Sequence, residues 1–366
     1  MRLLRKLASG FVQSAGRFSP PRLVMKLTPG ELYFIGEDDP IDGTRTSFVK
    51  VGIVRESESR TAEKRLNEHQ TGNPRQLRLL HAEEAPAVER IETLLQAEFA
   101  PCRIGGEWFY LPGAELDGAV ERADAHMDEA RTILPALSAA EDLKTTQSNG
   151  QSLTPDSTTV DRHRRLLDVR KQQDEAKRLK AQLTKALLEE ASSADGDSPY
   201  VRTEIRAPRA TFDSDAFTLA HPDLARRYTE DKHTVRKRFG LTGLQDHESD
   251  IRNDNPALFA HRTAVVESLE IGNTASEFHR LYLQLLALRG LLDWEQELLE
   301  AALQAACMEY EEVAGVCTWK RESVTKQALN VPALKADLPD LHEEFSTTTS
   351  ASSAVVIAKD LGYRFS

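Results

Sequence analysis

The sequence has few cysteines, few aromatic residues and no long hydrophobic run. Its three cysteines, Cys102, Cys307 and Cys317, form no CxxC pair, which argues against a disulfide framework or a cysteine–zinc site and favours a reducing cytoplasm. No stretch approaches roughly 18 consecutive apolar residues, so a membrane-spanning helix is excluded. Aromatic residues make up only 6% of the 366 residues, which predicts modest cores and much solvated helix.

The chain is acidic overall, but the acidic excess is unevenly distributed. A net charge of −11 on its face disfavours a non-specific nucleic-acid binder. Three segments are nevertheless basic: residues 1–27, which contain no acid, residues 162–185, with nine Lys or Arg against three acids, and residues 232–238. The protein is therefore a set of acidic blocks with basic inserts, and these inserts are the candidates for contact with nucleic acid.

The N-terminal segment 1–27 is a basic arm. Its Arg, Ser and small apolar residues, without acids, are compatible with an organelle-targeting peptide and equally with a disordered start.

Residues 28–113 are predicted to form a compact α/β unit. Short apolar runs at 32–35, 48–51 and 77–81 predict a three-stranded sheet. Ser59 or Thr61 is suited to cap a helix that runs to about Gln70, and Pro86 is suited to begin a second helix, which ends near Phe99. The unit is therefore expected to be a small sheet with flanking helices.

The remainder is predicted to be mostly α-helical, so the whole chain is assigned to the α+β class. Two long helices are expected at 162–191 and 276–312, the first strongly charged and the second with a broader apolar face. The expected divisions are a helix at 114–137, a Ser/Thr-rich linker at 138–160, a first helical module at 161–240, a connector at 241–275 and a second module at 276–366.

An internal repeat links the two helical modules. Phe212, Phe217, Pro222-Asp223-Leu224 and Tyr228 recur at the same spacing as Leu329, Leu334, Pro339-Asp340-Leu341 and Phe345. Each copy follows a long helix, which favours a duplication. The alternative is that Pro-Asp-Leu begins two unrelated helices.

The residues with chemical potential lie in the 28–113 unit. Strand alternation places Lys50 on the face opposite Val49 and Val51, and Gly52 beside it admits close approach of a backbone or a phosphate. Arg65 and His69 are four residues apart and project from one side of a helix. Glu92 falls on the inward side of the next helix, where a carboxylate is costly unless it meets a cation, a metal or hydrogen-bond donors.

The order of these motifs resembles the GIY-YIG nuclease superfamily, and most of all its T5orf172-type branch from phage and bacterial proteins. The motifs are Tyr33-Phe34-Ile35, Lys50-Val51-Gly52-Ile53, Arg65-Leu66-x-x-His69, Thr71-Gly72-Asn73-Pro74, Glu92 and Gly106-Glu107-Trp108-Phe109. The resemblance covers about a quarter of the chain. Single motifs are not specific, but their order and spacing together are.

This resemblance implies a small α/β nuclease that hydrolyses DNA phosphodiesters with Mg²⁺ or Mn²⁺. Carried over by position, Glu92 is the metal ligand, Arg65 stabilises charge on the phosphate, and Tyr33 is the base or orients the water with help from His69. Lys50 replaces the tyrosine of the second motif, and a lysine beside Tyr33 is expected to lower the pKa of its phenol. Leu32 stands where the family has a small residue, a departure that bears on the efficiency of catalysis more than on the fold.

Two stretches of the second half, 200–240 and 315–365, are weakly similar to the tail of YqaJ-type phage exonucleases. The catalytic Asp and Glu-x-Lys of those enzymes are not discernible, so only a DNA-associated accessory module is implied. A helical interaction domain is the alternative. The basic helix at 162–185 is compatible with phosphate contact and with a coiled-coil strand.

The leading hypothesis is a metal-dependent DNA endonuclease, joined by a flexible linker to a helical region that binds DNA or a partner, in a phage, mobile-element or defence setting. The runner-up is a DNA-binding or regulatory protein that keeps the fold with little cleavage, and the third is a coiled-coil assembly protein. The expected partner is DNA rather than a membrane, with protein contact or self-association through the helices at 162–190 and 276–312.

Overall fold

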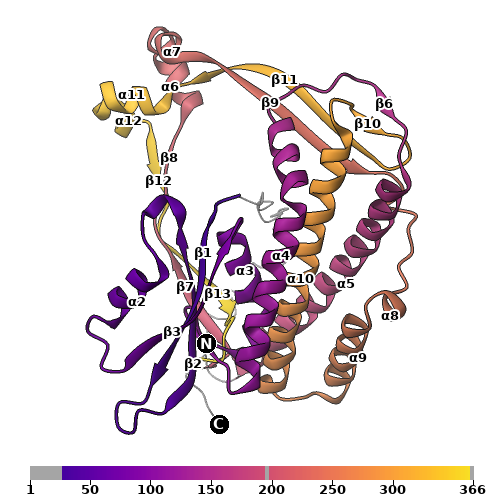
Figure 1. Ribbon diagram of the computed structural model, residues 1–366. Helices are drawn as coiled ribbons and strands as arrows, with labels where there is room; N and C mark the ends of the chain where they lie inside the picture. The colour runs from indigo at the N-terminus through magenta and orange to yellow at the C-terminus, as the bar shows by residue number, and fades with distance from the viewer. Residues whose placement is uncertain (1–26, 194–197, 363–366) are drawn as a thin grey trace.

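The computed structural model of the chain describes residues 27–193 and 198–362 (Figure 1). The basic arm predicted at 1–27 lies outside the described residues, apart from Leu27. In these ranges no helix has both the length and the apolar character needed to cross a bilayer.

The N-terminal unit is built on a five-stranded antiparallel sheet. Its strands are β1 (Gly30–Asp38), β2 (Arg45–Arg55), β3 (Gln76–Ala85), β4 (Arg103–Gly105) and β5 (Trp108–Tyr110), in the order β3-β1-β2-β5-β4. The predicted three-stranded sheet is therefore too small. The closing strand that the aromatic run after Gly106 predicts is present as β5, which pairs with β2. Only β4, with three residues, carries too little periodicity to count as a strand from sequence.

Helices cover both faces of this sheet. On one face α2 (Ala62–Gln70) packs on Tyr33, Ile35 and Val54. On the other, α3 (Val88–Glu98) and α4 (Ala114–Leu143) enclose Leu32, Phe34, Val49 and Val51 in the main core, next to the single turns η1 (Glu56–Glu58) and η2 (Ala100–Cys102). The predicted alternation along β2 is confirmed, because Val49 and Val51 share one face while Lys50 lies on the other.

Two long helices form the body of the second half. The apolar stripe of α5 (Ser157–Ser193) packs on α10 (Ala275–Cys307), in a core that includes Leu179, Leu183, Leu281 and Leu285. Basic residues of α5 pair with acids of α10: Arg165 bonds Glu295 at 2.5 and 2.8 Å, and Arg170 bonds Glu300. The apolar faces expected to mediate self-association thus contact each other within one chain.

The N-terminal unit is docked on α10 rather than tethered to it. Arg90 of α3 pairs with Glu297 at 2.7 Å and lies 5.6 Å from the ring centre of Trp294. A Cβ atom at Gly290 would lie 2.7 Å from that of Ala97, so the two helices are in close contact where α10 has no side chain.

The range predicted as a flexible linker, 138–160, overlaps two helices at its ends. Residues 138–143 complete α4, and α5 begins at Ser157. Between them, the Ser148 amide donates to Arg321 O at 2.9 Å, and β6 (Ser152–Leu153) pairs with β10 (Glu312–Val313). Polar residues here satisfy backbone groups of other segments, which composition alone does not reveal. The connector at 241–275 likewise holds α8 (Ile251–Asp254) and α9 (Pro256–Ile271).

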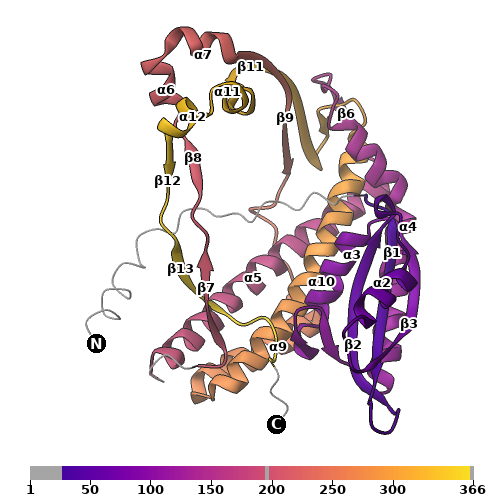
Figure 2. The same ribbon diagram turned by 90° about the vertical axis from the view of Figure 1, so that its left-hand side faces the viewer.

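Two antiparallel ribbons project from the helical body and meet at a small helical head (Figure 2). One ribbon pairs β9 (Thr229–Leu241) with β11 (Cys317–Leu329). The other pairs β7 (Val201–Arg206) with β13 (Ser352–Ile357), and beyond them β8 (Ala210–Phe212) with β12 (Ser346–Thr348). The head consists of α6 (Ser214–Ala220), α7 (Pro222–Tyr228), α11 (Val331–Asp337) and α12 (Pro339–Glu344).

The two stretches of the predicted repeat form equivalent elements in the head. Each copy has the order strand, helix, helix, strand, and Phe217 of the first copy and Leu334 of the second are both fully buried in one shared core. Asp213 and Asn330 cap equivalent helices, each accepting from an amide three residues ahead. The modules are less helical than predicted, because β9 and β11 are solvated on both faces for most of their length and so lack the apolar alternation of a half-buried strand.

Candidate functional site

The ring of Tyr33 lies against the sheet in the space above Gly52, which has no side chain. It lies opposite Gly52 in the β1–β2 register, and a Cβ atom at Gly52 would come within 2.6 Å of the Tyr33 hydroxyl oxygen. Glycine is therefore required here so that the ring can lie over β2. The expectation that Gly52 admits a backbone or phosphate is corrected, since the space is taken by Tyr33.

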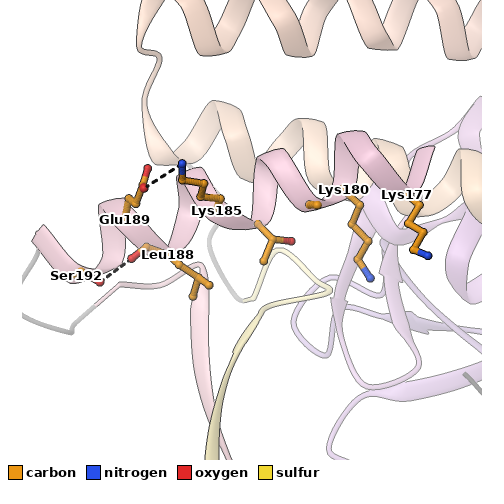
Figure 3. A pocket seen from close by; sticks show the side chains of 8 residues that line it. Lys177, Lys180, Lys185, Leu188, Glu189 and Ser192 are labelled. Carbon is orange, nitrogen blue, oxygen red and sulfur yellow. Dashed lines mark hydrogen bonds and ion pairs between the residues drawn. The ribbon is translucent and has the colours of Figure 1, made fainter. Parts of the chain in front are cut away.

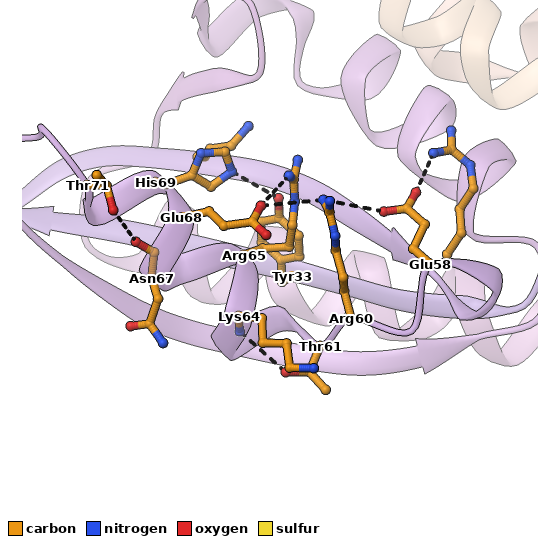
Figure 4. A network of polar contacts seen from close by, with 12 residues as sticks. Tyr33, Glu58, Arg60, Thr61, Lys64, Arg65, Asn67, Glu68, His69 and Thr71 are labelled. Carbon is orange, nitrogen blue, oxygen red and sulfur yellow. Dashed lines mark hydrogen bonds and ion pairs between the residues drawn. The ribbon is translucent and has the colours of Figure 1, made fainter.

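Helix α2 brings Arg65 and His69 to the same tyrosine (Figure 4). As expected from the sequence, Thr61 caps this helix by accepting from the Lys64 amide, and the helix ends at Gln70. Glu31 of β1 accepts from the Ala62 amide at 2.7 Å, which fixes the start of the helix on the sheet. His69 Nε2 then lies 3.5 Å from the Tyr33 hydroxyl.

Arg65 is held by Glu68 and also interacts with the hydroxyl of Tyr33. One of its terminal nitrogens donates to Glu68 at 2.8 Å, and Arg60 approaches the same carboxylate at 3.5 Å. The Nε atom of Arg65 is buried without a hydrogen-bond partner among the described residues. A guanidinium held in this way retains donors for a further acceptor.

Lys50 and Glu107 form an ion pair at the edge of the site. Lys50 is buried on β2, and Glu107 reaches it from the turn between β4 and β5, where Gly106 adopts a φ of +58°. The Glu107 carbonyl also accepts from the Val51 amide at 3.0 Å, which fixes the turn on the strand.

Glu92 approaches from α3, the helix layer on the other side of the sheet. Burial raises the pKa of Glu92 to about 7; the charge of Glu107 adds to this, and Lys50 and Arg55 oppose it. Its carboxylate makes no hydrogen bond or ion pair with any described residue. Glu92 is thus a half-buried carboxylate within the field of the Lys50–Glu107 pair, without a partner of its own.

Tyr33 and His69, which face each other, have pKa values shifted in opposite directions. Burial raises the pKa of Tyr33 above its usual 10, opposed by Arg65 and reinforced by Glu107 and Glu92. Burial, Lys50 and Arg65 lower the pKa of His69 below its usual 6.5. At neutral pH the tyrosine is therefore protonated and the imidazole is neutral.

The expectation that Lys50 lowers the pKa of Tyr33 is contradicted. The pKa is raised, and Arg65 is the cation that acts on the phenol, since Lys50 is paired with Glu107. The sequence predicted that Lys50 lies near Tyr33, but it did not predict that Glu107 is the partner of Lys50.

Two further residues belong to this neighbourhood. Glu107 appeared in a sequence motif without a role, and Arg103 did not appear at all. Arg103 Nε donates to the Gly106 carbonyl at 2.6 Å, and burial lowers the pKa of Arg103, while Asp360, Glu107 and Glu92 raise it. The Gly105-Gly106 pair is the only sequence signal, since it marks the tight turn that brings both residues to the site.

The site lies apart from an open pocket on α5. This pocket of about 800 Å³ runs along the C-terminal half of α5 and is lined by Lys177, Lys180 and Lys185 among others (Figure 3). None of the predicted site residues lines it. The candidate site is defined by its chemistry rather than by an enclosed cavity.

The donor set fits a divalent metal that needs few protein ligands. Within the described residues, no group of three or more His, Cys, Asp or Glu side chains is arranged to hold a metal ion. Mg²⁺ commonly keeps several waters and uses one or two carboxylates together with substrate phosphates. Glu92 meets this requirement, because a nearby cation would relieve the cost of ionising its half-buried, unpaired carboxylate.

Comparison with known families gives a match in the N-terminal unit. Residues 32–124 match the family model described as the T5orf172 domain, a branch of the GIY-YIG-like nuclease superfamily. This stretch of the chain is therefore a nuclease-like domain, and it contains all five predicted site residues. No curated protein and no solved structure matches the chain. The similarity of 200–240 and 315–365 to YqaJ-type exonucleases is not shown by these comparisons and stays a prediction.

Proposed function

We propose that the protein is a DNA endonuclease that hydrolyses phosphodiester bonds with Mg²⁺ or Mn²⁺, with its active site formed by Tyr33, Lys50, Arg65, His69 and Glu92. The observation that carries this proposal is the convergence on Tyr33 of a neutral imidazole and a guanidinium, within the field of an unpartnered carboxylate. The match of residues 32–124 to a nuclease-related domain supports it.

Arg65 binds the scissile phosphate in this proposal. Its guanidinium is held by Glu68, yet it keeps a buried donor without a partner. A planar guanidinium donates to two phosphoryl oxygens at once and stabilises the negative charge that builds up on them in the transition state.

Tyr33 and His69 accept the proton of the attacking water. The phenol of Tyr33 is protonated at neutral pH, so it is not a base by itself. It orients the water and passes one proton to His69 Nε2, 3.5 Å away, as the water oxygen bonds to phosphorus. The bond between phosphorus and the leaving oxygen breaks, and that oxygen takes a proton from solvent.

Glu92 is the residue that would hold the metal. A divalent cation bound there supplies positive charge that stabilises the phosphoryl oxygens and lowers the pKa of bound water. The Lys50–Glu107 pair fixes the charge around Glu92 and the position of the β4–β5 turn.

The alternative is a DNA-binding protein that keeps this fold with weak or no catalysis. The raised pKa of Tyr33 and the single unpartnered carboxylate are the observations that favour it. The two functions differ in cleavage rather than in binding.

Conversion of supercoiled plasmid to nicked circle tests the proposal. We expect nicking by the wild-type chain with Mg²⁺ or Mn²⁺, none with EDTA, and loss of at least 100-fold in Glu92→Ala, as for removal of a group that acts on the transition state. Glu121→Ala is the matched control, because Glu121 is an exposed glutamate on α4 outside the site. Equal nicking by wild type and Glu92→Ala would contradict the proposal, and DNA binding without nicking would favour the alternative.

A further inference from the structure

The β9·β11 ribbon is held at both ends and exposed between them. At its base, Trp319 and Arg321 of β11 are fully buried. The Arg321 guanidinium donates to the carbonyls of Leu143 at 3.1 Å and Tyr310 at 3.3 Å, which ties the strand to the helical body. At its far end the ribbon runs into the shared core of the head. The strand pair between these anchors stands clear of the helices in both views (Figures 1 and 2).

The two faces of this ribbon carry different side chains. Trp319, Arg321 and Phe239 lie on the face that packs on the body. Strand alternation puts every second residue on the opposite face, which we call the basic face. Its charged members are Lys232, Arg236, Arg238, Lys320 and Lys326, with the two acids Glu230 and Glu322.

The register places like charges directly opposite each other on the basic face. Lys232 pairs with Lys326, and Arg238 pairs with Lys320. Directly opposed like charges destabilise an antiparallel pair. Of these cations only Lys320 has an ion pair with a described residue, at 2.7 Å from Glu322. The arrangement costs stability in the free protein, and an anionic partner would relieve that cost.

We propose that the basic face of the β9·β11 ribbon binds duplex DNA through its phosphates. The major groove, about 12 Å wide, admits a two-stranded ribbon, so shape and charge favour the same occupant. From Lys232 to Arg238, at roughly 3.3 Å per residue, the basic face extends over about 20 Å, which is more than half a turn of duplex. The choice of DNA as the partner rests on the proposed function. The basic face itself lies outside the nuclease-like domain.

The salt dependence of DNA binding by the full chain tests this surface. Affinity for a short duplex is measured in EDTA, so that cleavage plays no part. The triple variant Lys232→Gln, Arg236→Gln and Lys326→Gln is expected to reduce the slope of log affinity against log salt by roughly three, at about 0.9 for each lost phosphate contact. Lys237→Gln is the matched control, because Lys237 is exposed on the same strand but belongs to the other face. A wild-type slope in the triple variant would overturn the proposal.

A second variant works in the opposite direction and does not depend on the folding of the triple variant. Glu322→Gln removes an acid from the basic face and frees Lys320, so duplex binding is expected to tighten at every salt concentration. Unchanged or weaker binding contradicts the proposal, as does equal loss of single-strand and duplex binding in the triple variant. If the wild-type chain does not nick DNA but the triple variant has a smaller salt slope, only the proposed function is refuted. If the wild-type chain nicks DNA with metal but the triple variant keeps the wild-type salt slope, only the ribbon surface is refuted.

Discussion

A single missing side chain positions the candidate site, because Tyr33 occupies the space that a Cβ atom at Gly52 would fill. Gly52→Ala is expected to push the phenol away from His69 and to cost about 1–3 kcal/mol of stability, as overpacking does. We expect plasmid nicking to fall at least ten-fold while the protein stays folded. Nicking rates with a thermal melt measure both effects. A folded Gly52→Ala variant with a wild-type rate would show that the position of Tyr33 is not critical.

The proton acceptor makes activity depend on pH. Burial and two cations hold the pKa of His69 below 6.5, and only the neutral imidazole accepts a proton. At saturating metal, which displaces the proton from Glu92, the nicking rate is expected to be flat near neutrality and to fall as pH drops through the pKa of His69. His69→Gln is expected to be slower by about 10²-fold or more and to lack that acidic limb. An unchanged limb in His69→Gln would assign the titration to another group.

The sequence predicted which candidate residues lie together better than it predicted their partners. Tyr33, Arg65 and His69 come together because strand and helix periodicities are local properties that spacing reveals. Glu107 and Arg103 reach the site through a turn between two strands of three residues each, and no pattern in the sequence shows that this turn returns to β2. The role expected of Lys50 failed for the same reason, since the Lys50–Glu107 pair depends on that return.

At the scale of elements, a buried histidine joins the nuclease-like domain to the helical body. His126 of α4 contacts Glu98 of α3 at 2.9 Å and Glu129 at 3.5 Å, and Trp294 of α10 donates to Glu129 at 2.7 Å. Burial alone would lower the pKa of His126, but the hydrogen bonds to Glu129 and Glu98 outweigh it and raise the pKa to about 9.

This cluster predicts a loss of stability in mild alkali. The protonated imidazole contributes fully below the unfolded pKa of 6.5, and its contribution, on the order of 3 kcal/mol, disappears as pH rises through about 9. Denaturant unfolding at a series of pH values from neutral upward measures it. His126→Gln is expected to be less stable at neutral pH and to show a smaller decline. The same decline in wild type and variant would exclude His126 as its cause.

The elements that sequence could not predict are those with few apolar contacts. Helix α5 was predicted because its apolar stripe repeats at helical spacing and packs on α10. The strands β9 and β11 carry charged side chains on both faces and are defined by pairing with each other across about ninety residues of chain. Pairing of distant segments is a property of the fold rather than of local pattern, so the cluster at 232–238 was expected in a helical module and lies on a strand.

At the scale of the whole molecule, the head is a separate small core carried by two ribbons. Phe217 and Leu334, one from each copy of the repeat, are buried together in it. Leu334→Ala is expected to destabilise the head by about 2–5 kcal/mol, as a large-to-small core change does. Amide hydrogen exchange is expected to quicken in both copies, at 210–230 and 329–348, while residues 32–124 are unaffected. Quickening confined to the second copy would show that the copies fold independently.

The Mg²⁺ dependence of nicking in Glu92 variants separates this site from any other source of cleavage. The nicking rate is measured as Mg²⁺ is raised, for wild type, Glu92→Asp and the control Glu121→Asp. If Glu92 holds the metal, Glu92→Asp needs about ten-fold or more Mg²⁺ for its half-maximal rate, as expected when a metal ligand is shortened, while Glu121→Asp matches wild type. An identical Mg²⁺ dependence in all three proteins would contradict this role of Glu92.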